Sequence, residues 1–85
     1  MIVYNLSLNK QAIKALEQID EPYYSKLKEA IYNLANEPRP QGYKKLKGRD
    51  AYRIRVANYR VIYEILDQVL QIEVIAIGHR KEVYD

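Results

Sequence analysis

The chain has 85 residues, of which 48% are hydrophobic, so it can form one domain around one modest core. It contains no cysteine, which excludes a disulfide framework, a thiolate metal site and a thiol nucleophile. No apolar run approaches the roughly 20 residues of a membrane span, and no signal pattern opens the chain. We therefore expect a single soluble domain over residues 1–85, located in the cytoplasm.

Positive charge is concentrated in one part of the chain. The net charge is only +3, but residues 39–60 hold eight Lys or Arg and one acid, which is a local charge of +7. Residues 61–79 hold three acids and no Lys or Arg. A basic segment this dense indicates a nucleic acid or an acidic protein as the partner.

The first half of the chain predicts a strand followed by two helices. Residues 1–6 alternate weakly, and Ser7 or Asn9 can cap the helix that follows. Residues 20–22 (Asp-Glu-Pro) divide two apolar stripes of helical spacing, and residues 37–40 (Glu-Pro-Arg-Pro) end the second. The stripes are Ala12, Ile13, Leu16 and Ile19, then Leu27, Ile31 and Leu34. The short linker between them predicts an antiparallel helix pair.

A β-hairpin is predicted over residues 52–63, because apolar and basic residues alternate there with the period of a half-buried strand. Ala57-Asn58 is the expected turn, since Asn tolerates a positive φ. The predicted pairs are Val56 with Tyr59, Arg55 with Arg60, Ile54 with Val61, Arg53 with Ile62 and Tyr52 with Tyr63. Paired residues share a face, so one face is apolar and the other is basic.

A second hairpin is predicted with its turn at Asp67-Gln68. The expected pairs include Tyr63 with Ile72, Val61 with Val74, Arg60 with Ile75 and Tyr59 with Ala76. Gly78 is expected to end the last strand. The whole is an α+β fold in which a helix pair covers the apolar face of a twisted, mainly antiparallel sheet and leaves the basic face open.

The basic face has two possible meanings. Arg55 and Arg60 would lie directly opposite each other, and like charges so placed destabilise a sheet by up to ~1 kcal/mol. The arginines either spread into water or bind a polyanion, and the unfavourable pairing favours the second. The preceding loop, with a possible short edge strand around residues 43–46, adds candidate contacts to an RNA backbone. These are Lys44, Lys45, Lys47 and Arg49.

Several segments, in this order and spacing, resemble the RelE/ParE superfamily of toxins from type II toxin–antitoxin systems. They are residues 38–48, Tyr52–Val56, residues 58–63, Gly78-His79-Arg80 and Tyr84. The resemblance implies a RelE-like, microbial-RNase-like fold and an acidic RelB-like antitoxin that wraps the toxin in a hetero-oligomer. RelE-like members are ribosome-dependent mRNA endoribonucleases, whereas ParE-like members inhibit DNA gyrase.

By motif position, the resemblance carries a set of functional residues onto this chain. Arg53 and Arg55 match the basic pair in the first strand of the family's hairpin, and Arg60 matches the arginine of its Tyr-Arg motif. Arg80 matches the arginine that follows the family's Gly-x pair, and Tyr84 matches the tyrosine near its C-terminus. This set favours the RelE-like branch. RelE itself has lysines where this chain has Arg53, Arg55 and His79, and the family often has Gly at the position of Ala57.

The chemistry of these residue types fits RNA cleavage without a metal or a cofactor. Guanidinium groups donate paired hydrogen bonds to phosphate oxygens but remain charged, so the arginines are expected to polarise the scissile phosphate. Proton transfer then falls to Tyr84 or His79. The candidate catalytic residues are Arg53, Arg55, Arg60, His79, Arg80 and Tyr84. A gyrase inhibitor and a plain nucleic-acid-binding domain remain alternatives.

Overall fold

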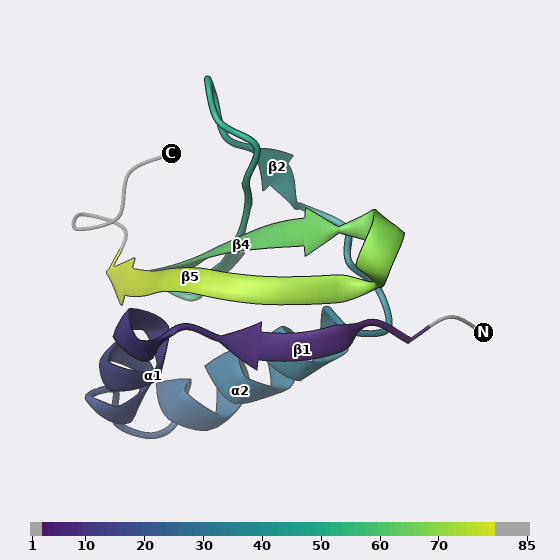
Figure 1. Ribbon diagram of the computed structural model, residues 1–85. Helices are drawn as coiled ribbons and strands as arrows, with labels where there is room; N and C mark the ends of the chain where they lie inside the picture. The colour runs from purple at the N-terminus through teal and green to yellow at the C-terminus, as the bar shows by residue number, and fades with distance from the viewer. Residues whose placement is uncertain (1–2, 80–85) are drawn as a thin grey trace.

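The computed structural model describes residues 3–79 and shows a mixed sheet with both helices on one of its faces (Figure 1). Its elements are β1 (Asn5–Leu8), α1 (Lys10–Glu17), α2 (Tyr23–Asn33), β2 (Lys44–Lys45), β3 (Tyr52–Val56), β4 (Tyr59–Leu66), the 3₁₀ turn η1 (Asp67–Val69) and β5 (Gln71–His79). Within residues 3–79 the sheet has five strands in the order β1-β5-β4-β3-β2. No helix in this part of the chain is long and apolar enough to cross a membrane.

Pairing in the sheet is antiparallel except for β1, which runs parallel to β5. The connection from β1 to the rest of the sheet passes through α1 and α2, and both helices pack against the same face (Figure 1). The predicted α+β class, with an N-terminal strand, two helices and a mainly antiparallel sheet, is confirmed. We call the opposite side of the sheet the open face.

The main hydrophobic core lies between the helices and the sheet. Its buried residues are Ala12, Leu27, Ile31, Leu34, Ile54, Val61, Tyr63, Ile72, Val74 and Ile77. The helical stripes and the apolar hairpin face predicted from the sequence therefore meet in one layer, except for Ile13, which is exposed. A second, smaller cluster of Leu46, Ala51 and Ile62 lies on the open face, with Ile75 and Ala76 packed against it.

The first hairpin has the predicted register. β3 and β4 pair from Tyr52 with Tyr63 to Val56 with Tyr59, and Arg55 lies opposite Arg60. The positive φ of the turn falls on Ala57, at 55°, rather than on Asn58. A residue with a Cβ atom is strained in this left-handed region, whereas glycine is not.

Replacing Ala57 by glycine is therefore expected to raise the free energy of unfolding by up to about 1 kcal/mol. The measurement is the urea midpoint of the two proteins, with Ala51→Gly as the matched control. Ala51 is 1% exposed and has no positive φ, so the same change there is expected to lower the midpoint. Equal destabilisation by both changes would show that the backbone at Ala57 is not strained.

The second hairpin departs from the predicted register. Its loop is longer than the two-residue turn predicted at Asp67-Gln68, because η1 is followed by Leu70 in the left-handed region, with φ 52°. Tyr63 consequently pairs with Val74 instead of Ile72, a shift of two residues that keeps the apolar face intact.

A β-bulge adds one further residue of shift. Ile62 pairs with Ala76 while Tyr63 pairs with Val74, so Ile75 is the extra residue in β5. Beyond the bulge, Arg60 lies opposite Gly78 instead of Ile75. An odd shift exchanges the two faces of a strand. The residues of β5 after Ile75 therefore lie on the faces opposite to those predicted.

Asn9 connects the bulge to the start of α1. Its Oδ1 accepts a hydrogen bond from the backbone N–H of Ala12 at 2.8 Å, which is the N-cap interaction predicted from the sequence. Its Nδ2 donates to the carbonyl oxygen of Ile75 at 3.0 Å, and its backbone N–H donates to that of Val74 at 2.9 Å. One side chain thus caps a helix and also provides a hydrogen-bond donor for the carbonyl group of the bulged residue.

Two substitutions of Asn9 should separate these contributions. Asn9→Ala removes both side-chain bonds and is expected to cost about 1–3 kcal/mol in the free energy of unfolding. Asn9→Asp keeps the acceptor for Ala12 but loses the donor to Ile75, so it should cost less. Urea denaturation measures both, and an Asp variant as unstable as the Ala variant would mean that the bulge contact dominates.

Candidate nucleic-acid interface

The arginine pair lies on the open face, at the end of the sheet that carries the Ala57–Asn58 turn. Arg55 is exposed and Arg60 is half-buried, and their positions in β3 and β4 are directly opposite. Gly78 is the next residue across, in β5. This row of the sheet therefore presents two guanidinium groups and a position without a side chain, which suits an approaching phosphate.

Arg53 does not share the exposure of the pair. It lies between Lys44 of β2 and Ile62 of β4, beside the smaller apolar cluster, and only 4% of its surface is exposed. The expectation of three open arginines around one phosphate is therefore wrong for Arg53. The reason is that the chain segment with Leu46 and Ala51 folds over this part of the sheet.

The other end of the open face is acidic. Glu64 and Glu73 lie directly opposite each other, and both are half-buried. The face therefore changes from basic at Arg55 and Arg60, through the apolar cluster, to acidic at these glutamates. A polyanion is attracted to the arginine end and repelled from the glutamate end, which restricts a nucleic acid to part of the face.

The lysine-rich segment is exposed as predicted, but its members point in different directions. In β2, Lys44 pairs with Arg53 and Lys45 with Tyr52, so successive lysines face opposite sides of the sheet. Lys45 Nζ donates to the carbonyl oxygen of Arg49 at 3.0 Å and so helps to shape the loop. Lys44 is the member placed on the open face, while Lys47 and Arg49 extend from the loop.

His79 lies on the helix side of the sheet, away from the arginine pair. It is opposite Tyr59, and the two rings meet edge-on with centroids 5.9 Å apart. The last strand was expected to end at Gly78, but β5 continues to His79, and the bulge at Ile75 determines the face on which His79 lies. We therefore do not assign the proton transfer predicted for His79. Arg80 and Tyr84 lie outside the described residues, and their predicted roles stay predictions.

A polar cluster closes the opposite end of the sheet. Arg39 donates to Asp67 Oδ2 at 2.9 Å, and the Tyr4 hydroxyl donates to Asp67 Oδ1. The hydrogen bond from Arg39 lowers the pKa of Asp67 below its usual range, and the bond to Asp67 raises the pKa of Tyr4. The cluster joins η1 to the segments before β1 and after α2, so it is a structural contact.

The lowered pKa of Asp67 predicts an acid-dependent contribution to stability. A carboxylate whose pKa is depressed in the folded state stabilises the fold above its unfolded pKa of about 3.9, and this stabilisation is lost as the pH falls through the folded value. The urea midpoints of the wild type and Asp67→Asn should therefore differ most above pH ~4 and converge below it. A difference that is constant with pH would contradict this role.

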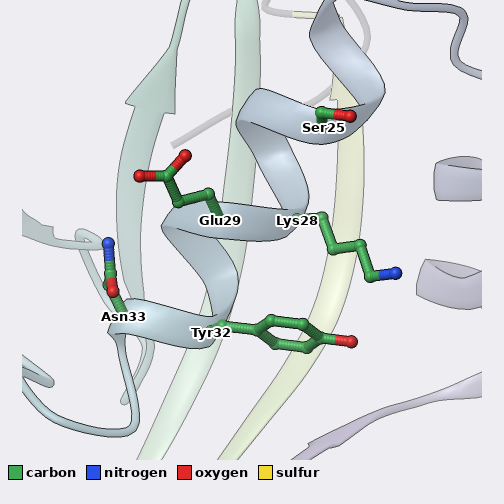
Figure 2. A pocket seen from close by; sticks show the side chains of 5 residues that line it. All are labelled: Ser25, Lys28, Glu29, Tyr32 and Asn33. Atoms are coloured by element: carbon green, nitrogen blue, oxygen red, sulfur yellow. The ribbon is translucent and has the colours of Figure 1, made fainter.

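A broad hollow lies on the outer face of α2, lined by Ser25, Lys28, Glu29, Tyr32 and Asn33 (Figure 2). Lys28 and Tyr32 extend to one side of the helix, while Glu29 and Asn33 lie on the other. Lys28 Nζ is 5.7 Å from the centre of the Tyr32 ring. The lining is mixed in charge and is separated from the open face by the sheet, so we do not assign the function to it.

The fold and the arginine pair define a small α+β protein with a basic area on the open face of its sheet. Comparison with known proteins shows the family to which it belongs. Residues 6–84 match the family model described as "ParE toxin of type II toxin-antitoxin system, parDE". The chain therefore belongs to this family of toxins, within the RelE/ParE superfamily. Among the described residues, no group of three His, Cys, Asp or Glu is placed to hold a metal ion.

The similar proteins include RelE toxins from bacteria and archaea. The chain is 28% identical to the mRNA interferase toxin RelE of Escherichia coli K12, over 98% of this chain and 92% of that protein. It is 34% identical to the putative toxin RelE1 of Methanocaldococcus jannaschii, over 74% of each chain. A crystal structure of the archaeal RelE–RelB complex from Pyrococcus horikoshii superposes with a TM-score of 0.84 at 30% identity, covering 96% of this chain and all of that chain.

Proposed function

We propose that the protein is the toxin of a type II toxin–antitoxin pair and cleaves mRNA on the ribosome without a metal ion. The observation that carries the proposal is the exposed Arg55 opposite Arg60, in a chain similar to proteins named mRNA interferases. The arginine pair binds the non-bridging oxygens of one phosphate and stabilises the charge that accumulates as the bond to phosphorus breaks.

In this reaction the 2′-hydroxyl of the RNA attacks the adjacent phosphorus atom. The O2′–P bond forms, the P–O5′ bond breaks, and a proton passes from the 2′-oxygen side to the departing 5′-oxygen. Arg55 and Arg60 supply the electrostatic part of this catalysis and Lys44 holds the RNA backbone nearby. We assign the proton transfers to Tyr84 and stabilisation of the leaving group to Arg80, as the sequence motif implies.

The proposed partner is an acidic antitoxin that covers the basic surface in the cytoplasm. The structural relatives include toxins crystallised with RelB, which supports a partner of this class. An acidic, amphipathic segment that folds on binding would neutralise residues 39–60, where the local charge is +7 from eight Lys or Arg and one acid.

The test is primer extension on an mRNA incubated with translating ribosomes and the purified protein. We expect cuts at discrete positions, absent for the Arg60→Ala, Arg80→Ala variant and absent when ribosomes are omitted. Cuts in mRNA without ribosomes would show that the protein is a nuclease, but would contradict the proposed dependence on the ribosome.

The match to the ParE family model supports a second candidate, inhibition of DNA gyrase. Purified gyrase and supercoiled DNA provide the parallel assay. Accumulation of cleaved DNA together with intact mRNA would replace the nuclease proposal by this one. An intact mRNA and unaffected gyrase would reject both activities.

A further inference from the structure

A row of three tyrosine rings runs from the core to the surface at the β2 edge of the sheet. Tyr63 is completely buried, Tyr52 is half-buried, and Tyr43, directly before β2, is 36% exposed. The ring centroids of Tyr63 and Tyr52 are 6.0 Å apart, as are those of Tyr52 and Tyr43. Tilted contacts at such distances stabilise aromatic pairs. Tyr43 is therefore the outer member of a packed row and not an isolated surface ring.

Two local features hold the outer part of this row in place. The guanidinium carbon of Arg39 lies 5.9 Å from the centre of the Tyr52 ring, and Arg39 is itself held by an ion pair. The backbone N–H of Tyr43 donates to the carbonyl oxygen of Pro40 at 3.0 Å, across a turn in which Gly42 has a φ of 92°. A positive φ at the third position is typical of a type II turn, and glycine adopts it without strain. The exposed ring is thus positioned before a ligand binds, which lowers the entropic cost of binding.

The chain segment that carries the exposed ring is strongly basic. Residues 38–49 hold five Lys or Arg and no acid. Lys45 is the register partner of Tyr52, so it lies on the same side of the sheet as the tyrosine row. Lys47 is exposed in the loop that follows β2. Cations at this edge attract the phosphates of a nucleic acid, and an aromatic ring among them can stack on a base.

The combination of ring and cations favours one kind of ligand. The exposed neighbours of Tyr43 in the chain are glutamine, glycine and lysine, so the ring is not part of a continuous apolar patch for an apolar protein surface. An unpaired base has a flat face for stacking and phosphates on both sides, whereas the base faces of a duplex are covered.

We propose that Tyr43 stacks on an unpaired base of RNA while Lys45 and Lys47 bind the phosphates that flank this base. The contact is separate from the phosphate site of the arginine pair on the open face. The inference rests on the proposed function for the choice of RNA as the ligand. The base belongs either to the mRNA or to the RNA of the ribosome, and the chemistry of the contact is the same for both.

The test compares two single-stranded RNA oligonucleotides of equal length, one with bases and one built from abasic nucleotides, in binding titrations with the full chain. Tyr43→Ala is expected to weaken binding of the first about fivefold or more, the effect of losing one base stack, and to leave binding of the second unchanged. Tyr43→Phe should bind both as the wild type does. Tyr32→Ala, which removes a ring that is 55% exposed and also has a lysine beside it, should have no effect. Equal binding of both oligonucleotides by the wild type, a comparison that needs no substitution, overturns the inference.

Salt dependence separates the ring from the charges. Tyr43→Ala should lower the affinity without changing the slope of log affinity against log salt concentration. Lys45→Ala should reduce this slope by about 0.7, the value for one phosphate contact on a single strand. A slope that falls equally in Tyr43→Ala would mean that this substitution acts by displacing the cations, which contradicts stacking.

Ultraviolet cross-linking on translating ribosomes, mapped by primer extension, identifies the RNA that supplies the base. A cross-link of the wild type that is lost in Tyr43→Ala is expected in the mRNA or in the ribosomal RNA, and its absence from both contradicts the inference. If the wild type cleaves mRNA but Tyr43→Ala binds RNA and cross-links as the wild type does, the stacking site is wrong and the nuclease stands. If no mRNA is cleaved while base-dependent binding is lost in Tyr43→Ala, the stacking site stands and the nuclease proposal fails.

Discussion

Replacing Arg55 by alanine is expected to lower the rate of mRNA cleavage by about 10²-fold to 10³-fold, the usual effect of removing one donor that stabilises a developing negative charge. Arg55 is the exposed member of the pair, so its loss removes a phosphate ligand without opening the core. Relief of the like charge opposite Arg60 should leave stability unchanged or slightly higher. The measurements are single-turnover cleavage on ribosomes and the urea midpoint of the same samples.

Matched variants make this test specific. Arg55→Lys keeps the charge but not the paired donors, so it should recover only part of the rate. Lys14→Ala removes an exposed charge from α1, on the opposite side of the sheet from the arginine pair, and should leave the rate of cleavage unchanged. A rate for Arg55→Ala equal to that of Lys14→Ala would remove the arginine pair from the catalytic site.

The largest effect on stability is expected from Tyr63→Ala, at about 3–5 kcal/mol in the free energy of unfolding. Tyr63 is completely buried between the sheet and the helices, and its hydroxyl donates to the carbonyl oxygen of Pro38 at 2.8 Å. Burial also raises its pKa above the usual value for tyrosine, so the hydroxyl remains a donor even at alkaline pH. Loss of the ring leaves a cavity and an unpaired carbonyl, and a domain of this size has little stability to spare.

Two further variants divide this cost. Tyr63→Phe keeps the ring and loses the bond to Pro38, so it should cost about 1–2 kcal/mol. Tyr32→Ala removes a ring that is 55% exposed and should change the urea midpoint little. If Tyr63→Phe were as destabilising as Tyr63→Ala, the hydrogen bond and not the packing would hold the loop after α2.

The first hairpin could be predicted because its pattern of apolar and basic residues is compatible with only one register. Strict alternation around a two-residue turn sets the register, and a slip of one residue would bury Arg55 and expose Ile54. The second hairpin could not be predicted in the same way. A leucine at a positive φ carries no turn signal, and Leu70 occupies that position. The register error of two residues follows from this longer loop.

The candidate site was predictable only where local pairing determines it. The Arg55–Arg60 pair follows from the hairpin alone. The burial of Arg53 depends on where the segment with Leu46 folds, and the placement of His79 depends on the bulge. Both are tertiary effects, and in the second case the Asn9–Ile75 contact joins residues 66 positions apart.

The bulge also bears on how such a toxin can diverge. Deletion of Ile75 would leave Ala76, Gly78 and His79 opposite the same residues of β4, so every later side chain of the strand would keep its present face. Such a deletion would remove the local bend of β5 without moving a functional group to the other side of the sheet. The length of this strand can therefore change by one codon at the bulge while the arginine row keeps its composition.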